Sequence, residues 1–157
     1  APQPKGEGWA WFMPSRGAEW SQYVEAIGAA GERLAGGLAA GVPGAKAAGR
    51  PIITGFSQGG MLSWTIATAH PDLVSAALPI GGLLPAPLYP AGPSTVPIEV
   101  FHGDADTVVS HAMDATAAEA VKSRGWPVVF HSYPGVGHTI PPAMRADYAR
   151  SLAAVCR

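Results

Sequence analysis

Serine, aspartate and histidine stand in three short segments whose order along the chain suits covalent acyl chemistry. Ser57 lies in GFSQG, Asp106 in HGDADTVV and His138 in GVGH. A serine hydroxyl is a weak nucleophile, and it becomes reactive when a histidine takes its proton and a carboxylate orients that histidine. We therefore predict that Ser57 is the nucleophile, Asp106 the acid and His138 the base.

The G-x-S-x-G pattern around Ser57 makes mechanical sense only where a strand turns sharply into a helix. The flanking glycines relieve crowding at such a turn. Gln58 would begin the helix, so its backbone amide has no partner within the helix and favours a developing oxyanion. We predict that the Gln58 amide is an oxyanion donor, and we assign no role to its side chain.

The elements that must position these residues alternate along the chain. Apolar runs without polar alternation predict buried strands at residues 50–56, 74–80, 97–102 and 127–133. Helical spacing and stop signals predict helices at residues 17–41, 58–70, 110–124 and 141–157. This alternation predicts a single α/β domain over residues 1–157, with about four parallel strands and helices on both faces.

Two regions have further expected features. Residues 1–16 are rich in Pro, Gly and aromatic residues and are expected to form an irregular lead-in. The 110–124 helix is expected to carry a polar face at Asp114, Glu119 and Lys122. Asp104 is expected to cap the turn beside Asp106 rather than to take part in chemistry.

Composition narrows the classes of partner. Of 157 residues, 48% are hydrophobic and 13% charged, and the net charge is −1. The chain shows no basic cluster of the kind that binds nucleic acid, and no apolar run approaches the ~18–20 residues of a membrane span. The single cysteine, Cys156, excludes an internal disulfide and favours a reducing compartment, so we expect a cytoplasmic location.

The three motifs together resemble the phospholipase/carboxylesterase family of α/β-hydrolases, which includes the acyl-protein thioesterases. That family is marked by GFSQGG, HGxxDxVV and GxGH, and the sequence has all three. The stretch Ala10–Trp11–Phe12 also resembles an AWF/Y stretch of bacterial members. The resemblance implies a reduced α/β-hydrolase core, the same roles for Ser57, Asp106 and His138, and no cofactor.

The sequence differs from this family at its N-terminal side, where members have further strands and an H-G-x-G-type loop whose amide completes the oxyanion hole. We expect a backbone amide near Trp9–Phe12 to take that place. The strand at Arg50–Phe56 would then have an exposed apolar edge. We expect residues 1–16 or a second copy of the chain, as a homodimer, to cover this edge by strand pairing.

Several residues have both a functional and a structural interpretation. Trp11 and Phe12 could line an acyl pocket or cover the core, and Leu83 and Leu84 could form a lipophilic rim or a rigid connector. His102, Asp104, Asp106 and His111 match no zinc-site spacing, so we expect no metal, and His102 is expected to pack at a strand end.

The predicted reaction is hydrolysis of short or medium acyl carboxylic esters through an acyl-enzyme. Acyl-protein thioesterase or lysophospholipase activity is the alternative within the enzyme class. A binding module that keeps Ser57, Asp106 and His138 but lacks a complete oxyanion hole is the alternative outside it. Turnover of a small ester or thioester substrate distinguishes these alternatives.

Overall fold

A computed structural model of the chain describes residues 2–5, 8–14, 17–41 and 49–156. Its strands are β1 (Gln3–Lys5), β2 (Gly8–Ala10), β3 (Ile52–Phe56), β4 (Ala76–Ile80), β5 (Ile98–Gly103) and β6 (Val128–Tyr133). Its helices are α1 (Trp20–Ala39), α2 (Gln58–Ala69), the short 3₁₀ helix η1 (Ala86–Leu88), α3 (His111–Lys122) and α4 (Pro142–Val155).

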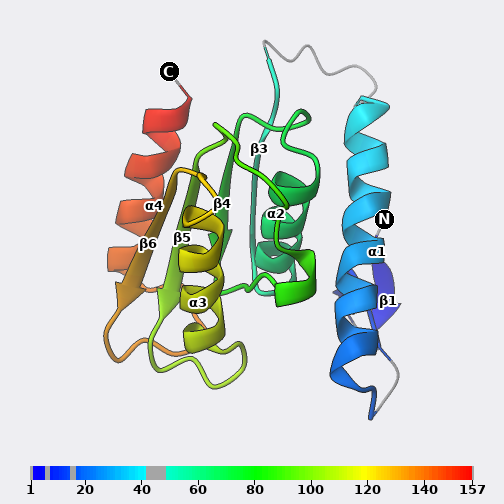
Figure 1. Cartoon of the computed structure of the whole chain (residues 1–157). Helices are drawn as coiled ribbons and strands as arrows, with labels where there is room; N and C mark the ends of the chain where they lie inside the picture. The colour runs from blue at the N-terminus through cyan, green and yellow to red at the C-terminus, as the bar shows by residue number, and fades with distance from the viewer. Residues whose placement is uncertain (1, 6–7, 15–16, 42–48, 157) are drawn as a thin grey trace.

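The main sheet has four parallel strands in the order β3-β4-β5-β6, as expected from the apolar runs (Figure 1). All five residues of β4 are buried, which agrees with a central strand covered on both faces. Because the strands are parallel, their carboxyl ends lie at one edge, and the segments after β3, β5 and β6 can meet there. These are the segments that carry Ser57, Asp106 and His138.

Helices cover both faces of the sheet, as predicted. On one face, Trp64 and Ile66 of α2 and Val121 of α3 pack with Val100 of β5 in a buried apolar cluster. On the other face, Met144 of α4 packs with residues of β4 and β5. The chain is thus an α/β protein with α2 and α3 on one side of the sheet and α4 on the other (Figure 1).

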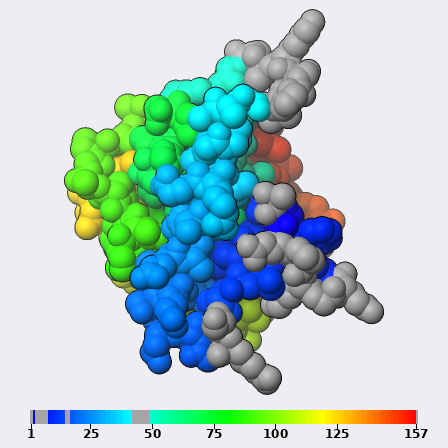
Figure 2. Space-filling view, turned by 90° about the vertical axis from the view of Figure 1, so that its right-hand side faces the viewer, coloured from blue at the N-terminus to red at the C-terminus, as the bar shows by residue number. Residues whose placement is uncertain are grey.

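The N-terminal segment is more regular than the sequence suggested. In place of an irregular lead-in, β1 and β2 pair antiparallel in a small sheet of their own. The segment lies beside the N-terminal half of α1 in Figure 2, and buried Phe12 packs with Ile27 of α1 and Met61 of α2. Within the described residues, no strand pairs with the free edge of β3, so the hairpin does not extend the main sheet.

Two further features of the described residues concern membranes and metal ions. None of the helices in this part of the chain is long and apolar enough to cross a membrane. No cluster of three or more His, Cys, Asp or Glu side chains suited to a metal ion occurs among the same residues.

Candidate active site

Ser57 occupies the sharp turn between β3 and α2. Its φ of 57° and ψ of −116° lie in a region that side chains rarely adopt, and no other non-glycine residue in the described part of the chain has a positive φ. Its N–H donates to the Ile80 carbonyl of β4 at 2.9 Å, and its carbonyl accepts from Met61 in the first turn of α2. Such strain costs on the order of 1–3 kcal/mol and persists only where the surroundings hold it.

Glycines allow the backbones around this turn to approach closely. A Cβ built at Gly55 would lie 2.6 Å from the backbone of Gly59, and one at Gly60 would lie 2.7 Å from the Ile80 oxygen. Neither contact is possible for a real side chain, so only glycine permits this packing of α2 against β3 and β4. Gly55 and Gly60 therefore have a direct steric cause, whereas a Cβ at Gly59 would meet nothing within 4 Å.

His138 and Asp106 meet Ser57 at the carboxyl edge of the sheet. His138 Nε2 lies 3.0 Å from Ser57 Oγ, and His138 Nδ1 lies 2.7 Å from Asp106 Oδ2. The Phe56 ring packs against the His138 ring, tilted by 32° with centroids 4.6 Å apart, which restricts the orientation of the imidazole. The three side chains thus form one hydrogen-bonded series, although they come from distant parts of the chain.

Asp106 is held in its charged form. Its Oδ1 accepts hydrogen bonds from the backbone amides of Val108 and Val109 at 2.8 and 2.9 Å, and its Oδ2 faces His138. Burial opposes the charge, but these hydrogen bonds outweigh it and hold the pKa of Asp106 below its ordinary value. Asp104 instead accepts from the Gly135 amide at 2.7 Å, which ties the loop after β5 to the loop after β6.

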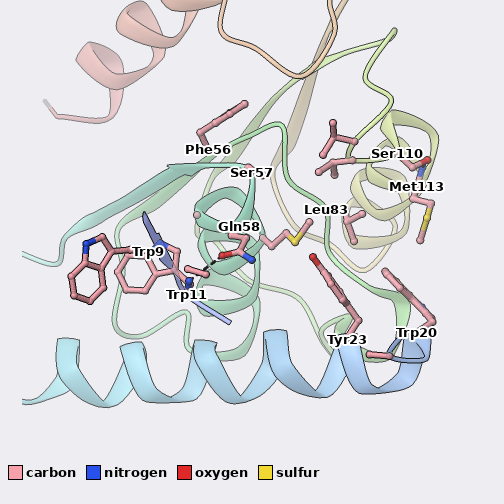
Figure 3. A pocket seen from close by; sticks show the side chains of 16 residues that line it. Trp9, Trp11, Trp20, Tyr23, Phe56, Ser57, Gln58, Leu83, Ser110 and Met113 are labelled. Carbon is pink, nitrogen blue, oxygen red and sulfur yellow. Dashed lines mark hydrogen bonds between the residues drawn. The ribbon is translucent and has the colours of Figure 1, made fainter. Parts of the chain in front are cut away.

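A cavity of about 1020 Å³ opens beside Ser57. Figure 3 shows Trp9 and Trp11 on one side of it, Trp20 and Tyr23 from the start of α1 on another, and Ser110 and Met113 near α3. The lining includes Trp11 and Leu83, which the sequence suggested for an acyl pocket. Phe12 and Leu84 are buried, 3% and 1% exposed, and do not line this cavity.

The reason for these two differences is the direction of each side chain. Phe12 points inward and meets Tyr23 edge to face, with ring centroids 5.5 Å apart. Leu84 belongs to the core cluster under α2 and α3, and it borders an adjoining cavity of about 320 Å³ that shares Trp20 and Met113 with the first. Both residues therefore lie in the core and do not line the cavity beside Ser57.

The side chain of Gln58 has a role that the sequence did not indicate. Its Oε1 accepts from the Trp11 amide at 3.0 Å, and its Nε2 donates to the Phe12 carbonyl at 3.0 Å. These two bonds attach the N-terminal segment to the start of α2. Figure 3 shows the first of them. Because the Trp11 amide is engaged in this way, it is not free to bind an oxyanion, which removes one of the expected donors from the Trp9–Phe12 stretch.

Asp114 and His102 also differ from expectation. Asp114 does not lie on a polar face of α3 but is fully buried, where its carboxylate binds the Trp64 indole N–H at 3.0 Å and His102 Nδ1 at 2.7 Å. His102 is equally buried, and its Nε2 lies 3.3 Å from Asp106 Oδ2. The periodicity of the helix could not reveal this, because the partners that satisfy Asp114 lie on α2 and β5.

The chain is similar in sequence and in fold to known proteins. Acyl-protein thioesterase 1 of Neurospora crassa is 35% identical over 104 residues, which cover 59% of this chain and 40% of that protein. The crystal structure of esterase PE8 superposes with a TM-score of 0.76 at 26% identity, covering 94% of this chain and 71% of that one. For Zea mays acyl-protein thioesterase 2 the TM-score is 0.74 at 26% identity, with 94% and 72% covered.

The extent of these matches places the chain within a group of hydrolases. It spans about 40% of the length of the Neurospora protein, and its fold follows the solved esterase and thioesterase over nearly all of its own length. The sequence model of the phospholipase/carboxylesterase family matches residues 3–156, which include Ser57, Asp106 and His138. The chain therefore belongs to the phospholipase/carboxylesterase family of α/β-hydrolases.

Proposed function

We propose that the protein hydrolyses short or medium acyl carboxylic esters through an acyl-enzyme on Ser57. The observation that carries this proposal is the series of contacts from Ser57 Oγ to His138 Nε2 at 3.0 Å and from His138 Nδ1 to Asp106 Oδ2 at 2.7 Å. Ser57 lines the aromatic cavity at the start of α2. The likeness to esterase PE8 supports the same reaction class.

The proposed reaction proceeds in two halves. Ser57 Oγ attacks the acyl carbonyl carbon as its proton passes to His138 Nε2, and the Gln58 amide donates to the oxyanion. His138 then returns the proton to the leaving oxygen as the ester bond breaks, and Ser57 keeps the acyl group. Water attacks this acyl-enzyme and gives a proton to His138, which returns it to Ser57 as the carboxylic acid leaves.

The cavity lining favours a neutral acyl ester over a charged lipid. Among the residues that the structure describes, the sixteen that line it include no Asp, Glu, Lys or Arg. A phosphate headgroup is usually bound by Arg or Lys, and these described walls offer neither. Thioester cleavage by the same residues is the second candidate, because the Neurospora and Zea mays relatives are thioesterases by name.

A series of substrates tests the proposal. We expect p-nitrophenyl esters from acetyl to decanoyl to be hydrolysed, and a serine-directed fluorophosphonate to label Ser57 in a one-to-one ratio. Coenzyme A thioesters with matched acyl chains are the comparison, and a higher kcat/KM for these would favour the thioesterase. Absence of turnover with every ester and thioester would contradict both and favour a non-catalytic binding module.

We further propose that the free edge of β3 pairs with a second copy of the chain. Thr54 and Phe56 of this strand are exposed, and an apolar groove of about 460 Å³ lies beside it between α1, β3 and α2. Unpaired strand edges of this kind are normally covered.

Sedimentation tests this proposed dimer. We expect the wild-type protein to sediment as a dimer and Thr54→Lys to convert it to a monomer. We expect Thr116→Lys, which changes an exposed residue of α3, to leave the dimer intact. A monomeric wild-type protein would contradict the proposal.

A further inference from the structure

A buried histidine, His102, lies close to the proposed acid, Asp106. His102 lies on β5 and is 0% exposed. Its Nδ1 is 2.7 Å from Asp114 Oδ2, and its Nε2 is 3.1 Å from the Val109 carbonyl and 3.3 Å from Asp106 Oδ2. The polar partners of both ring nitrogens are thus oxygens of carboxyl or carbonyl groups.

The surroundings of His102 decide where its protons are. Nε2 must carry a hydrogen, because the Val109 carbonyl and the Asp106 carboxylate have none to donate. One further hydrogen lies between Nδ1 and Asp114, on either the ring or the carboxyl group. The second oxygen of Asp114 already accepts from the Trp64 indole at 3.0 Å. The pair therefore holds two protons and has no net charge.

The directions in which the pKa values of His102 and Asp114 are shifted agree with this count of protons. Burial opposes a charged His102, but its hydrogen bond to Asp114, the Asp114 charge and the Val109 carbonyl outweigh burial and raise the pKa of His102. Burial raises the pKa of Asp114 to about 6, against the opposing effects of His102 and Trp64. Each group thus holds its proton more firmly than it would in water.

We propose that His102, supported by Asp114 and Trp64, is a positioning residue for Asp106, an inference that rests on the proposed function. The support acts by two routes. Nε2 lies at ion-pair distance, 3.3 Å, from Asp106 Oδ2. Its hydrogen bond goes to the Val109 carbonyl, and Val109 donates its own N–H to Asp106 Oδ1 at 2.9 Å. His102 thus contacts Oδ2 itself and is linked to Oδ1 through Val109.

This arrangement makes His102 and His138 share one oxygen of Asp106. His138 Nδ1 is 2.7 Å from Oδ2 and His102 Nε2 is 3.3 Å from it. Removing the His102 donor leaves Asp106 a stronger acceptor for His138, which then takes up its proton at higher pH. It also frees the carboxylate to move, and a misplacement of ~1 Å can cost ~10²-fold in rate.

Three other titratable groups face this cluster and must be considered in a pH profile. His111 of α3 meets the His102 ring edge-on with centroids 5.5 Å apart, and burial and the His102 charge lower its pKa. Asp104 follows β5, and Tyr89 near Asp114 has a raised pKa because of burial. A His111→Gln variant identifies any contribution of that ring to the profile.

Two replacements of His102 distinguish positioning from packing. Asn reaches only the Asp114 side, whereas Gln reaches the Val109 carbonyl and Asp106. We expect His102→Asn to lower kcat about 10- to 100-fold with little change in KM, and to move the acid limb of kcat/KM upward by about 0.5 pH unit or more. We expect His102→Gln to keep kcat within about fivefold of wild type, because its amide retains the donor.

One further variant is a matched control. His131→Gln disrupts another histidine–carboxylate contact, to Glu99 at 3.1 Å, at a distance from Ser57. We expect it to change neither kcat nor the acid limb.

Nuclear magnetic resonance of ring nitrogens gives a readout that needs no turnover. We expect His102 Nε2 to be protonated from pH 6 to 8 in the wild type, and the His138 titration to move to higher pH in His102→Asn. An unprotonated Nε2, or equal losses in the Asn and Gln variants with an unchanged acid limb, would overturn the proposal. If the wild type hydrolyses no ester or thioester, the proposed function fails while the nitrogen measurement still decides the role of His102.

Discussion

Replacing Ser57 with alanine is expected to lower kcat for ester hydrolysis by a factor on the order of 10⁶, as in other serine nucleophile deletions. The Ser57 hydroxyl is the group that His138 Nε2 faces at 3.0 Å, and its backbone holds it at the mouth of the cavity. Alanine removes the attacking oxygen and leaves the turn, the cavity and the Asp106–His138 contact in place. Initial rates with p-nitrophenyl butyrate and labelling by a fluorophosphonate measure this loss.

Ser63 provides the control for this substitution because it lies on the same helix. Its hydroxyl is buried and donates to the Gly59 carbonyl at 2.7 Å, so it has no contact with the acyl site. We expect Ser63→Ala to retain both turnover and labelling. Undiminished hydrolysis in Ser57→Ala, or labelling of Ser110 in the same cavity, would show that another residue is the nucleophile.

Asp106→Asn is expected to lower kcat by about 10⁴-fold while the protein stays folded. The Val108 and Val109 amides donate to Oδ1, so the asparagine oxygen will face them and its NH₂ group will face His138. His138 Nδ1 must then accept, and the ring proton moves to Nε2, where it points at Ser57. In that tautomer the imidazole cannot remove the serine proton.

Asp104→Asn is the matched control for Asp106→Asn, since both carboxylates lie in the same loop. Asp104 accepts a single bond from the Gly135 amide at 2.7 Å, which an asparagine oxygen can also accept. We expect kcat within about threefold of wild type for this variant. Circular dichroism and thermal unfolding of both variants show whether a loss of rate reflects chemistry or folding, and equal losses would contradict the assignment of Asp106.

The lowered pKa of Asp106 has a consequence for the wild-type pH profile. Its carboxylate remains charged well below neutral pH, so its protonation does not set the loss of activity on moderate acidification. The acid limb therefore reports groups other than Asp106, among which the proposed mechanism places the transferred proton on His138. Comparison with the His111→Gln variant then separates the effect of the His102 variants from that of the neighbouring ring.

Much of the fold could be predicted from local sequence patterns. The strands expected at 50–56, 74–80, 97–102 and 127–133 correspond to β3, β4, β5 and β6 within two residues at each end. Apolar runs of this length, bounded by Gly and Pro, are local signals of a strand buried on both faces. The chain order of the three motifs likewise indicated which strand ends must meet, because parallel strands bring their carboxyl ends together.

The tertiary structure decided which polar groups could be buried and which aromatic residues face the cavity. Asp114 was expected on the surface of α3, yet it is buried because Trp64, fifty residues earlier in the chain, and His102 supply its hydrogen bonds. The sequence left Phe12 open between the acyl site and the core, and contacts with α1 and α2 place it in the core. The sequence by itself determined the four strands of the main sheet, the four α-helices and the nucleophile turn, since each depends on near neighbours. Whether a carboxylate or an aromatic ring is buried depends on partners from distant elements, and only the folded chain brings these together.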